Sequence, residues 1–339
     1  MSTNSVDFFL LFLQAEQEES GSFHDMIAIE IMDLRRNRGR GRRKQTGSDP
    51  GVTVMESKRD IGAILVFLAA VCYSLGGVCI KLIPWNGLAI NGARTAIAVV
   101  VLGIYLKAIH HPLRLNRWIL LGAVAIFLTN ALFSIANKLT TASNTIVLQF
   151  TAPIFVMLFT AFFFRKKPEA LDLMACAAVF IGIVLCFVGS LGGGALAGNL
   201  LAVVSGMTYA VVFMMNELPN SDAISSVFWG DVISACVGFP YVMQETDFSG
   251  IVILNLLILG VVQVALGYIF LCIGLKTVDP VRSSLISGIE PVLNPIWVAL
   301  FYGERVTVMS LAGGVVVVGS VLVYNILKIR KNRTAAGSA

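Results

Sequence analysis

Length, composition and charge define the class of protein. Of the 339 residues, 57% are hydrophobic and only 13% are charged, and the mean hydropathy is +0.83. A soluble domain carries about twice that share of charge, so the composition excludes a soluble protein and indicates an integral membrane protein. Apolar runs of about 20 residues match helices that cross a ~30 Å hydrocarbon core, whereas the strands of a membrane barrel would be about half as long. We therefore expect an all-helical integral membrane protein.

The first 57 residues differ in composition from the rest of the chain. They contain a short apolar segment (residues 8–14), an acidic patch (16–19) and a basic run (35–44). Such a mixture does not form a core, so we expect this extension, residues 1–57, to be mostly disordered. The basic run lacks interleaved aromatic residues, which argues against a nucleic-acid partner. Met55 opens a short charged lead into the first apolar run, and translation that begins at Met55 is a further prediction.

Ten apolar runs follow, and each is long enough for a membrane-spanning helix. The predicted spans are residues 61–81, 87–106, 118–136, 142–164, 169–189, 198–216, 223–243, 251–275, 281–302 and 307–327. An even number of spans places both termini on one side of the membrane. Basic residues gather in the loops of that side and in the tail, residues 329–339, which predicts that both termini are cytoplasmic. We expect the protein in the plasma membrane.

The two halves of the chain repeat each other. Residues aligned by an offset of 138 are Gly122 with Gly260, Lys138 with Lys276 and Pro153 with Pro291, and an offset of 136 aligns Tyr73 with Tyr209. Each half contains five spans, and an odd number turns the second copy upside down relative to the first. The sequence therefore predicts two inverted five-helix repeats, residues 58–190 and 191–328. Secondary transporters with inverted repeats place a binding site near the membrane midplane.

The ninth predicted span contains the acidic residue Glu290. Pro291 and Pro295 cannot donate hydrogen bonds to the preceding turn, so we expect kinks at both. The polar residues that share one helix face in this span are Ser283, Ser287, Glu290, Asn294 and Trp297. An ionisable residue within a span is by default a functional candidate, and we interpret Glu290 as a substrate or proton site, with Asn294 and Trp297 beside it. The alternative is a structural hydrogen bond from Glu290 to a neighbouring helix.

Charged side chains are few in the other spans. Arg94 lies in the second span and Asp231 in the seventh. A rise of about 1.5 Å per residue places Asp231 and Glu290 at similar depth, and two such acids share one proton if they lie close together. The alternatives are a capping or ion-pair role for Asp231 and a structural tether for Arg94.

Neutral residues add candidates from other spans. Gln149 stands close to Pro153, which predicts a kink in the fourth span for the same reason as Pro291. Tyr209 offers an amphipathic wall in the sixth span. The first half has Ala152 opposite Glu290, so only the second half brings a carboxylate to its kinked span. Most polar residues of a helical bundle form hydrogen bonds between helices, which is the plainer interpretation of the neutral candidates.

No motif for a metal site or for catalysis is evident. All six cysteines lie inside apolar runs without C-x-x-C or Cys/His spacing, so we predict neither a disulfide framework nor a metal site. Residue patterns for nucleophilic or metal-dependent catalysis and for phosphate binding are also missing. We predict no cofactor and no enzymatic activity.

Three stretches carry a resemblance to a known family. They are YSLGGVCIK (residues 73–81), ARTAIA (93–98) and EPVLNPIWVALFYGE (290–304), and together they resemble the drug/metabolite transporter superfamily, specifically its EamA-like permeases. The resemblance covers about residues 58–327, and it implies export or import of small metabolites, often amino acids, driven by ion gradients rather than by ATP. The acidic signature of the superfamily matches residues 303–304, whereas the basic residues 165–167 stand at the equivalent end of the fourth span.

Two classes of function follow from these patterns. The first is a secondary transporter of a small metabolite, coupled to protons through Glu290 and Asp231, with an uncoupled facilitator or exchanger as the alternative within transport. The second is a membrane scaffold, or a receptor that works through its basic N-terminal arm. A scaffold does not need two kinked half-sites, so the repeat favours transport. Whether the protein forms a homodimer is left open.

Overall fold

The computed structural model describes residues 50–165, 168–188, 196–303 and 308–337. Residues 1–49, most of the predicted extension, lie outside the described residues. The first described helix, α2 (Pro50–Ser74), begins before the predicted first span. Residues 50–57 are therefore helical rather than disordered, since adding turns to an existing helix costs little once the apolar run has nucleated it.

The chain divides into two units. The smaller one consists of residues 1–56 and 103–113, and the larger one of residues 57–102 and 114–339. In the smaller unit a helix ends at Ala108, and the chain turns with His110 in the left-handed region (φ 53°) and a hydrogen bond of 3.0 Å from the His111 amide to the Leu106 carbonyl. The larger unit contains the candidate site.

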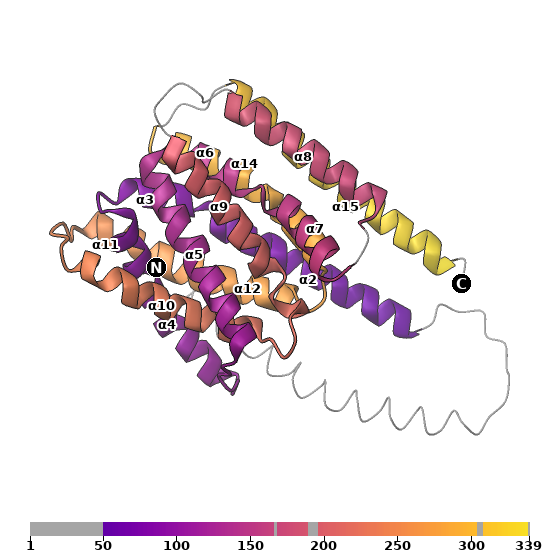
Figure 1. The fold of residues 1–339 in the computed structure, drawn as a ribbon, viewed down its shortest axis with the longest axis horizontal. Helices are drawn as coiled ribbons and strands as arrows, with labels where there is room; N and C mark the ends of the chain where they lie inside the picture. The colour runs from indigo at the N-terminus through magenta and orange to yellow at the C-terminus, as the bar shows by residue number, and fades with distance from the viewer. Residues whose placement is uncertain (1–49, 166–167, 189–195, 304–307, 338–339) are drawn as a thin grey trace, which may run out of the picture. The chain divides into compact units, whose positions relative to one another are not determined.

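Every regular element in the described residues is a helix (Figure 1). After α2 the elements are α3 (Gly76–Leu82), α4 (Gly87–Ala108), α5 (Arg117–Leu139), α6 (Ala142–Gln149), α7 (Ala152–Phe163), α8 (Ala170–Val188), α9 (Leu196–Phe213), η1 (Met215–Glu217), α10 (Ala223–Val242), α11 (Gly250–Leu257), η2 (Ile258–Leu266), α12 (Gly267–Gly274), α13 (Pro280–Ile286), η3 (Ser287–Ile289), α14 (Glu290–Phe301) and α15 (Val308–Gly337). The prediction of an all-helical protein is confirmed for this part of the chain.

Eight segments of the described residues are long and apolar enough to cross a membrane. They are Ile61–Leu82, Gly87–Ala108, Arg117–Leu139, Ala142–Phe163, Leu196–Phe213, Ala223–Val242, Gly250–Gly274 and Pro280–Phe301. A shorter apolar helix, Ala170–Gly182, lies in the predicted fifth span, and α15 contains the predicted tenth. The structure thus supports a protein with many membrane-spanning helices, and the count of ten stays a prediction.

Three of these spans are interrupted near their middle. α2 gives way to α3 at Leu75, α6 to α7 at residues 150–151, and α13 to α14 through the short η3 helix. Pro153 and Pro291 stand in the first turns of α7 and α14. The backbone N–H groups of a first turn have no partner within the helix, so proline, which has no N–H, is tolerated there and each helix starts again. Pro295 lies inside α14.

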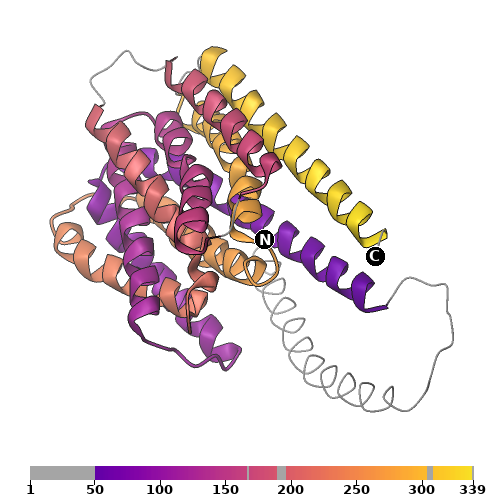
Figure 2. The ribbon, with the colours of Figure 1, turned by 45° about the vertical axis from the view of Figure 1, so that its right-hand side comes forward.

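Close helix contacts hold the larger unit together. α5 packs against α9 and α10, and α8 lies alongside α15 in both views (Figures 1 and 2). α4 and α10 touch through glycines: a Cβ atom added to Gly92 would lie 2.6 Å from the Cα of Gly238. Only glycine permits backbones to approach this closely, as is common between helices in membranes.

Two tryptophan side chains connect α10 and the loop that follows it to the first half of the chain. At one end the Trp85 indole donates to the Asp247 carbonyl (2.8 Å) and packs against Phe248, with ring centroids 5.1 Å apart. At the other end the Trp229 indole donates to the Arg114 carbonyl (3.1 Å). The halves of the chain are therefore joined at both ends of this helix.

Candidate functional site

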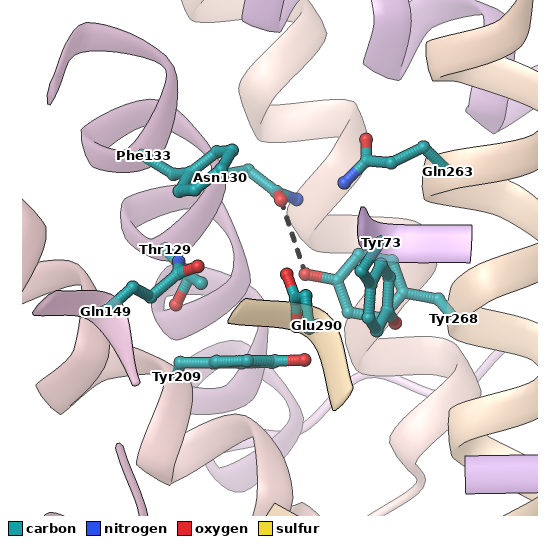
Figure 3. Close-up of a pocket in the computed structure, with 9 residues that line it drawn as sticks. All are labelled: Tyr73, Thr129, Asn130, Phe133, Gln149, Tyr209, Gln263, Tyr268 and Glu290. Carbon is teal, nitrogen blue, oxygen red and sulfur yellow. Dashed lines mark hydrogen bonds between the residues drawn. The ribbon is translucent and has the colours of Figure 1, made fainter. Parts of the chain in front are cut away.

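The three interrupted spans converge on one small cavity (Figure 3). Tyr73 stands at the end of α2, Gln149 at the end of α6 and Glu290 at the start of α14. The residues that line the cavity are Tyr73, Thr129, Asn130, Phe133, Gln149, Tyr209, Gln263, Tyr268 and Glu290. Interrupted helices within a membrane are tolerated where they line a cavity, so the interruptions and the cavity explain each other.

Glu290 is the one acidic residue in this lining, which contains no basic residue. Its side chain is 4% exposed, and within the described residues no hydrogen bond or ion pair to its carboxylate is formed. The carboxylate lies next to the hydroxyl end of Tyr209 and points toward Asn130 and the Tyr268 hydroxyl (Figure 3). As the first residue of α14 it also stands at the positive end of that helix dipole, which favours the ionised form, whereas burial disfavours it.

Three tyrosine rings form the wall next to Glu290. The ring centroids of Tyr73 and Tyr268 are 5.4 Å apart and those of Tyr73 and Tyr209 are 6.3 Å apart, both in edge-to-face geometry. The Tyr268 hydroxyl donates to Asn130 Oδ1 at 3.4 Å. The buried hydroxyls of Tyr73 and Tyr209 have no hydrogen-bond partner among the described residues, although Ser287 lies near the latter.

Gln149 is fixed by a chain of hydrogen bonds from the first half into α9. Its Nε2 donates to Ser205 Oγ at 2.7 Å, and Ser205 Oγ donates to the Thr129 carbonyl at 2.9 Å. α9 can approach the α6–α7 interruption because Gly206 has no side chain: an added Cβ atom would lie 2.5 Å from the Gln149 carbonyl oxygen. The arrangement leaves Oε1 of Gln149 as an acceptor toward the cavity.

Arg94 and Asp231 lie behind the lining. Arg94 is fully buried and donates to Gln263 Oε1 (2.9 Å), the Asn130 carbonyl (3.1 Å) and Asn91 Oδ1 (3.3 Å). Asp231 is fully buried, lies within electrostatic reach of Arg94, and neither of its oxygens has a hydrogen-bond partner among the described residues. Gln263, which stands in the π-helical segment η2, therefore separates this charge pair from the cavity.

Asn294 and Trp297 hold α14 against the interruption of the first span. Asn294 Nδ2 donates to the Ser74 carbonyl and Trp297 Nε1 to Ser74 Oγ, each at 3.0 Å. Gly77 leaves the space that the Asn294 amide occupies. These two residues share a helix face with Glu290, yet they anchor the helix and do not line the cavity.

The sequence-based candidates thus divide into two groups. Glu290, Gln149 and Tyr209 line the cavity, whereas Asp231, Arg94, Asn294 and Trp297 lie outside its lining. Asp231 and Glu290 do not meet, because Asp231 interacts with Arg94 and Tyr268 instead. The structure therefore offers no support for a proton shared between the two acids.

Six lining residues were not among the sequence-based site candidates. Tyr73, Asn130, Gln263 and Tyr268 were recognisable as polar residues within apolar runs, but nothing in the sequence separates them from residues that join helices. Thr129 and Phe133 gave no signal beyond their helical spacing around Asn130. Among the described residues no group of three His, Cys, Asp or Glu side chains could hold a metal ion.

The cavity is small in this conformation. A volume of about 20 Å³ admits the centre of a water-sized sphere, which is room for about one water molecule and not for a metabolite. Binding of a larger molecule therefore requires the interrupted helices to move.

A multi-span helical bundle with a polar cavity at its helix interruptions is the arrangement in which secondary transporters place a binding site. The sequence model of the EamA-like transporter family matches residues 60–188 and 196–326, and the chain belongs to this family. A Clostridium kluyveri protein named an uncharacterized transporter is 24% identical over 295 residues, which cover 78% of this chain and 93% of that protein. A Salmonella typhimurium protein named a probable amino-acid metabolite efflux pump is 28% identical over 210 residues, or 56% of this chain and 69% of that protein.

A solved structure supports the fold. A protein crystal structure superimposes with a TM-score of 0.63 and covers 78% of this chain and 98% of its own, at 17% sequence identity. At that identity the likeness shows the fold alone. The family match agrees with the resemblance seen in the three sequence stretches, and the recognition of an EamA-like transporter is confirmed.

Proposed function

We propose that the protein is a secondary active transporter that moves a small metabolite across the plasma membrane by alternating access, coupled to protons. One observation carries this proposal: Glu290 is the one acidic residue that lines the cavity, and it has no partner among the described residues. A bare carboxylate at such a position costs several kcal/mol, so it must bind a proton, a cation or water. Whether a proton, a cation or water is bound to Glu290 then determines which conformation is more stable.

Contacts between residues of the two halves support the inverted repeat. Tyr268 donates to Asn130, and the two are separated by 138 residues, the offset that aligns the halves. Tyr73 and Tyr209, which align at an offset of 136, pack edge to face. A residue touches its own equivalent only close to a two-fold axis. Both pairs line the cavity, which therefore lies where the axis of two inverted five-helix halves, ten spans in all, would pass.

The interruptions supply hinges for alternating access. Each joins two rigid half-helices through residues that are not part of a regular α-helix, and such residues can absorb a change in backbone angles. Rocking one half against the other would open the cavity to either side in turn. Protonation of Glu290 from one side favours one conformation, and release to the other side allows substrate to take the place of the proton. No chemical change to the substrate is part of this cycle, so the protein is not an enzyme.

Orientation and substrate are proposed on different grounds. The basic residues of loops and tail favour cytoplasmic termini. The name of the Salmonella typhimurium relative favours an amino-acid-like metabolite. A homodimer is compatible with this mechanism, but the cavity is formed within one chain and does not require it.

Uptake into proteoliposomes tests the proposal. The full chain is reconstituted, a panel of labelled metabolites is offered with and without a pH gradient, and liposomes without protein serve as the control. We expect at least one metabolite to accumulate above its outside concentration only when the gradient is present. Uptake that merely equilibrates, with or without the gradient, would contradict proton coupling and establish a facilitator.

A further inference from the structure

The lining around Glu290 specifies the charge of the ligand. It contains one carboxylate and no Lys, Arg or His, so an occupant that balances the charge is a cation. Burying an unpaired charge in such a site is costly, whereas a pair that is also hydrogen-bonded is tolerated. The nearest guanidinium, that of Arg94, is held behind the lining by Gln263, Asn91 and the Asn130 carbonyl, and does not line the cavity.

The lining also offers acceptors to a ligand that donates hydrogen bonds. The two carboxylate oxygens of an ionised Glu290 can only accept, whereas the buried, unpartnered hydroxyls of Tyr73 and Tyr209 can accept or donate. An ammonium group carries three such donors and no acceptor. The free amide NH₂ of Asn130 can accommodate a neutral oxygen of the ligand, but it brings no charge with which to bind a carboxylate.

Three tyrosine rings lie around the same part of the cavity. Tyr73 packs edge to face against Tyr209 and Tyr268 with ring centroids 6.3 and 5.4 Å apart, and Glu290 lies next to the hydroxyl end of Tyr209 (Figure 3). A cation within about 6 Å of a ring centroid is attracted by the ring, more strongly where water is excluded. A carboxylate with neighbouring aromatic faces favours an organic ammonium over a small hydrated ion.

We propose that the substrate is an organic amine with a net positive charge, bound through its ammonium group to Glu290 between the rings of Tyr73, Tyr209 and Tyr268. This inference rests on the proposed transport function, and it replaces the amino-acid-like substrate proposed there with an amine that lacks the carboxylate. A zwitterionic amino acid differs from such an amine by one carboxylate, for which the lining offers no cationic partner. The amine and the proton then compete for Glu290, so that the binding of one displaces the other.

Matched ligand pairs test the charge of the substrate. The purified full chain is measured with phenethylamine and phenylalanine, tyramine and tyrosine, and 3-methylbutylamine and leucine, by equilibrium binding and by thermal stabilisation. Each pair differs by the carboxylate alone. We expect at least one amine to bind about tenfold or more tightly than its amino-acid partner, because the extra carboxylate enters without a counter-charge.

Substitutions of lining residues test whether the amine binds in the cavity. We expect Glu290→Gln to weaken amine binding by about tenfold or more and Tyr209→Leu by about tenfold, and Tyr209→Phe to weaken it less than Tyr209→Leu because it keeps the ring and loses only the hydroxyl. Tyr241→Leu, an exposed tyrosine near the end of α10, is the matched control and should leave binding unchanged. The melting temperature of each ligand-free variant shows that it is folded.

Two outcomes overturn the substrate class. One is an amino acid that binds as tightly as its amine in every pair, and the other is the absence of binding by all three amines. Either result leaves the proposed function standing if the proteoliposomes still show gradient-driven accumulation of another metabolite. Conversely, tight amine binding without any dependence of uptake on the pH gradient would support the substrate class and reject proton coupling.

Discussion

The interrupted span of the first half, α6–α7, can be compared with that of the second half, α13–α14. In both, a short helix ends, a few residues follow in another conformation, and the next helix starts with a proline in its first turn. The C-terminal ends of α7 and α14 also match. Phe162 and Phe163 are 78% and 68% exposed, and Leu300 and Phe301, which follow them at an offset of 138, are 68% and 66% exposed. Both second helices thus direct bulky apolar side chains outward, as lipid contact requires.

The two spans differ in the residues that face the interior. At the same offset, Ala152 corresponds to Glu290, Val156 to Asn294 and Phe159 to Trp297. The second half therefore carries the carboxylate and the two hydrogen bonds to Ser74 that hold α14 in place. The comparison shows that both halves contain an interrupted span, while one half supplies the charged group. In the proposed mechanism two elements would move around a single site for the coupling ion.

The largest expected effect concerns the inversion of the halves, on which the comparison depends. Cysteines at Leu115, in the loop before α5, and at Thr246, in the loop before α11, are introduced after the six natural cysteines are replaced. We expect a membrane-impermeant reagent to label position 115 from the cytoplasm and position 246 from outside, because corresponding loops of inverted halves lie on opposite sides. Labelling of both from one side would exclude the inverted repeat.

A smaller effect is expected from glycines that contact the two interruptions. A Cβ atom on Gly206 would meet the Gln149 carbonyl oxygen, which is backbone and cannot move aside, whereas one on Gly77 would meet the Asn294 side-chain amide. We expect Gly206→Ala to lower the free energy of unfolding by about 1–3 kcal/mol and Gly77→Ala by less. Thermal unfolding in detergent measures both. Gly314→Ala, where the added atom meets nothing within 4 Å, is the control and should unfold no earlier than the original protein, because alanine in a helix interior is favoured over glycine by about 0.5–1 kcal/mol.

The smallest effect concerns Trp297. The change Trp297→Phe keeps an aromatic ring but removes the hydrogen bond to Ser74 Oγ, and so makes the second half resemble the first, which has Phe159 there. We expect a loss of about 0.5–1.5 kcal/mol in the free energy of unfolding. If the free energy of unfolding is unchanged, the hydrogen bond from Trp297 does not hold α14 in place. The difference between the two interrupted spans then lies in Glu290 and Asn294 alone.

The sequence predicts the fold class well because membrane helices and family motifs depend on local composition. Low charge and long apolar runs identify the bundle, and residues 290–304 identify the family. It also singles out Glu290, because an acid within an apolar run needs an explanation. These signals require no knowledge of which helices are neighbours.

The remaining cavity residues depend on contacts between distant helices. Tyr73, Asn130 and Tyr268 meet because several spans converge on one point, and no single span reveals that convergence. Helical periodicity placed Asn294 on the face of Glu290, but Gly77 lets α3 approach so closely that Asn294 bonds to Ser74 instead of lining the cavity. In α13, helical periodicity cannot separate a face that lines a cavity from the other faces, because residues 282–286 are all buried and every face contacts protein.

The most direct test of the central claim is gradient-driven accumulation by the Glu290→Gln variant, compared with Glu217→Gln outside the cavity and with Asp231→Asn behind it. Glutamine keeps the size and much of the hydrogen bonding of Glu290 but cannot release a proton. We expect Glu290→Gln to lose accumulation by at least about tenfold, while exchange of substrate across the membrane persists once the substrate concentration is raised about tenfold or more to offset the weaker binding, and the other two variants to retain dependence on the pH gradient. Accumulation by Glu290→Gln with the original pH dependence, or its loss in Asp231→Asn alone, would contradict the assignment of the coupling proton to Glu290.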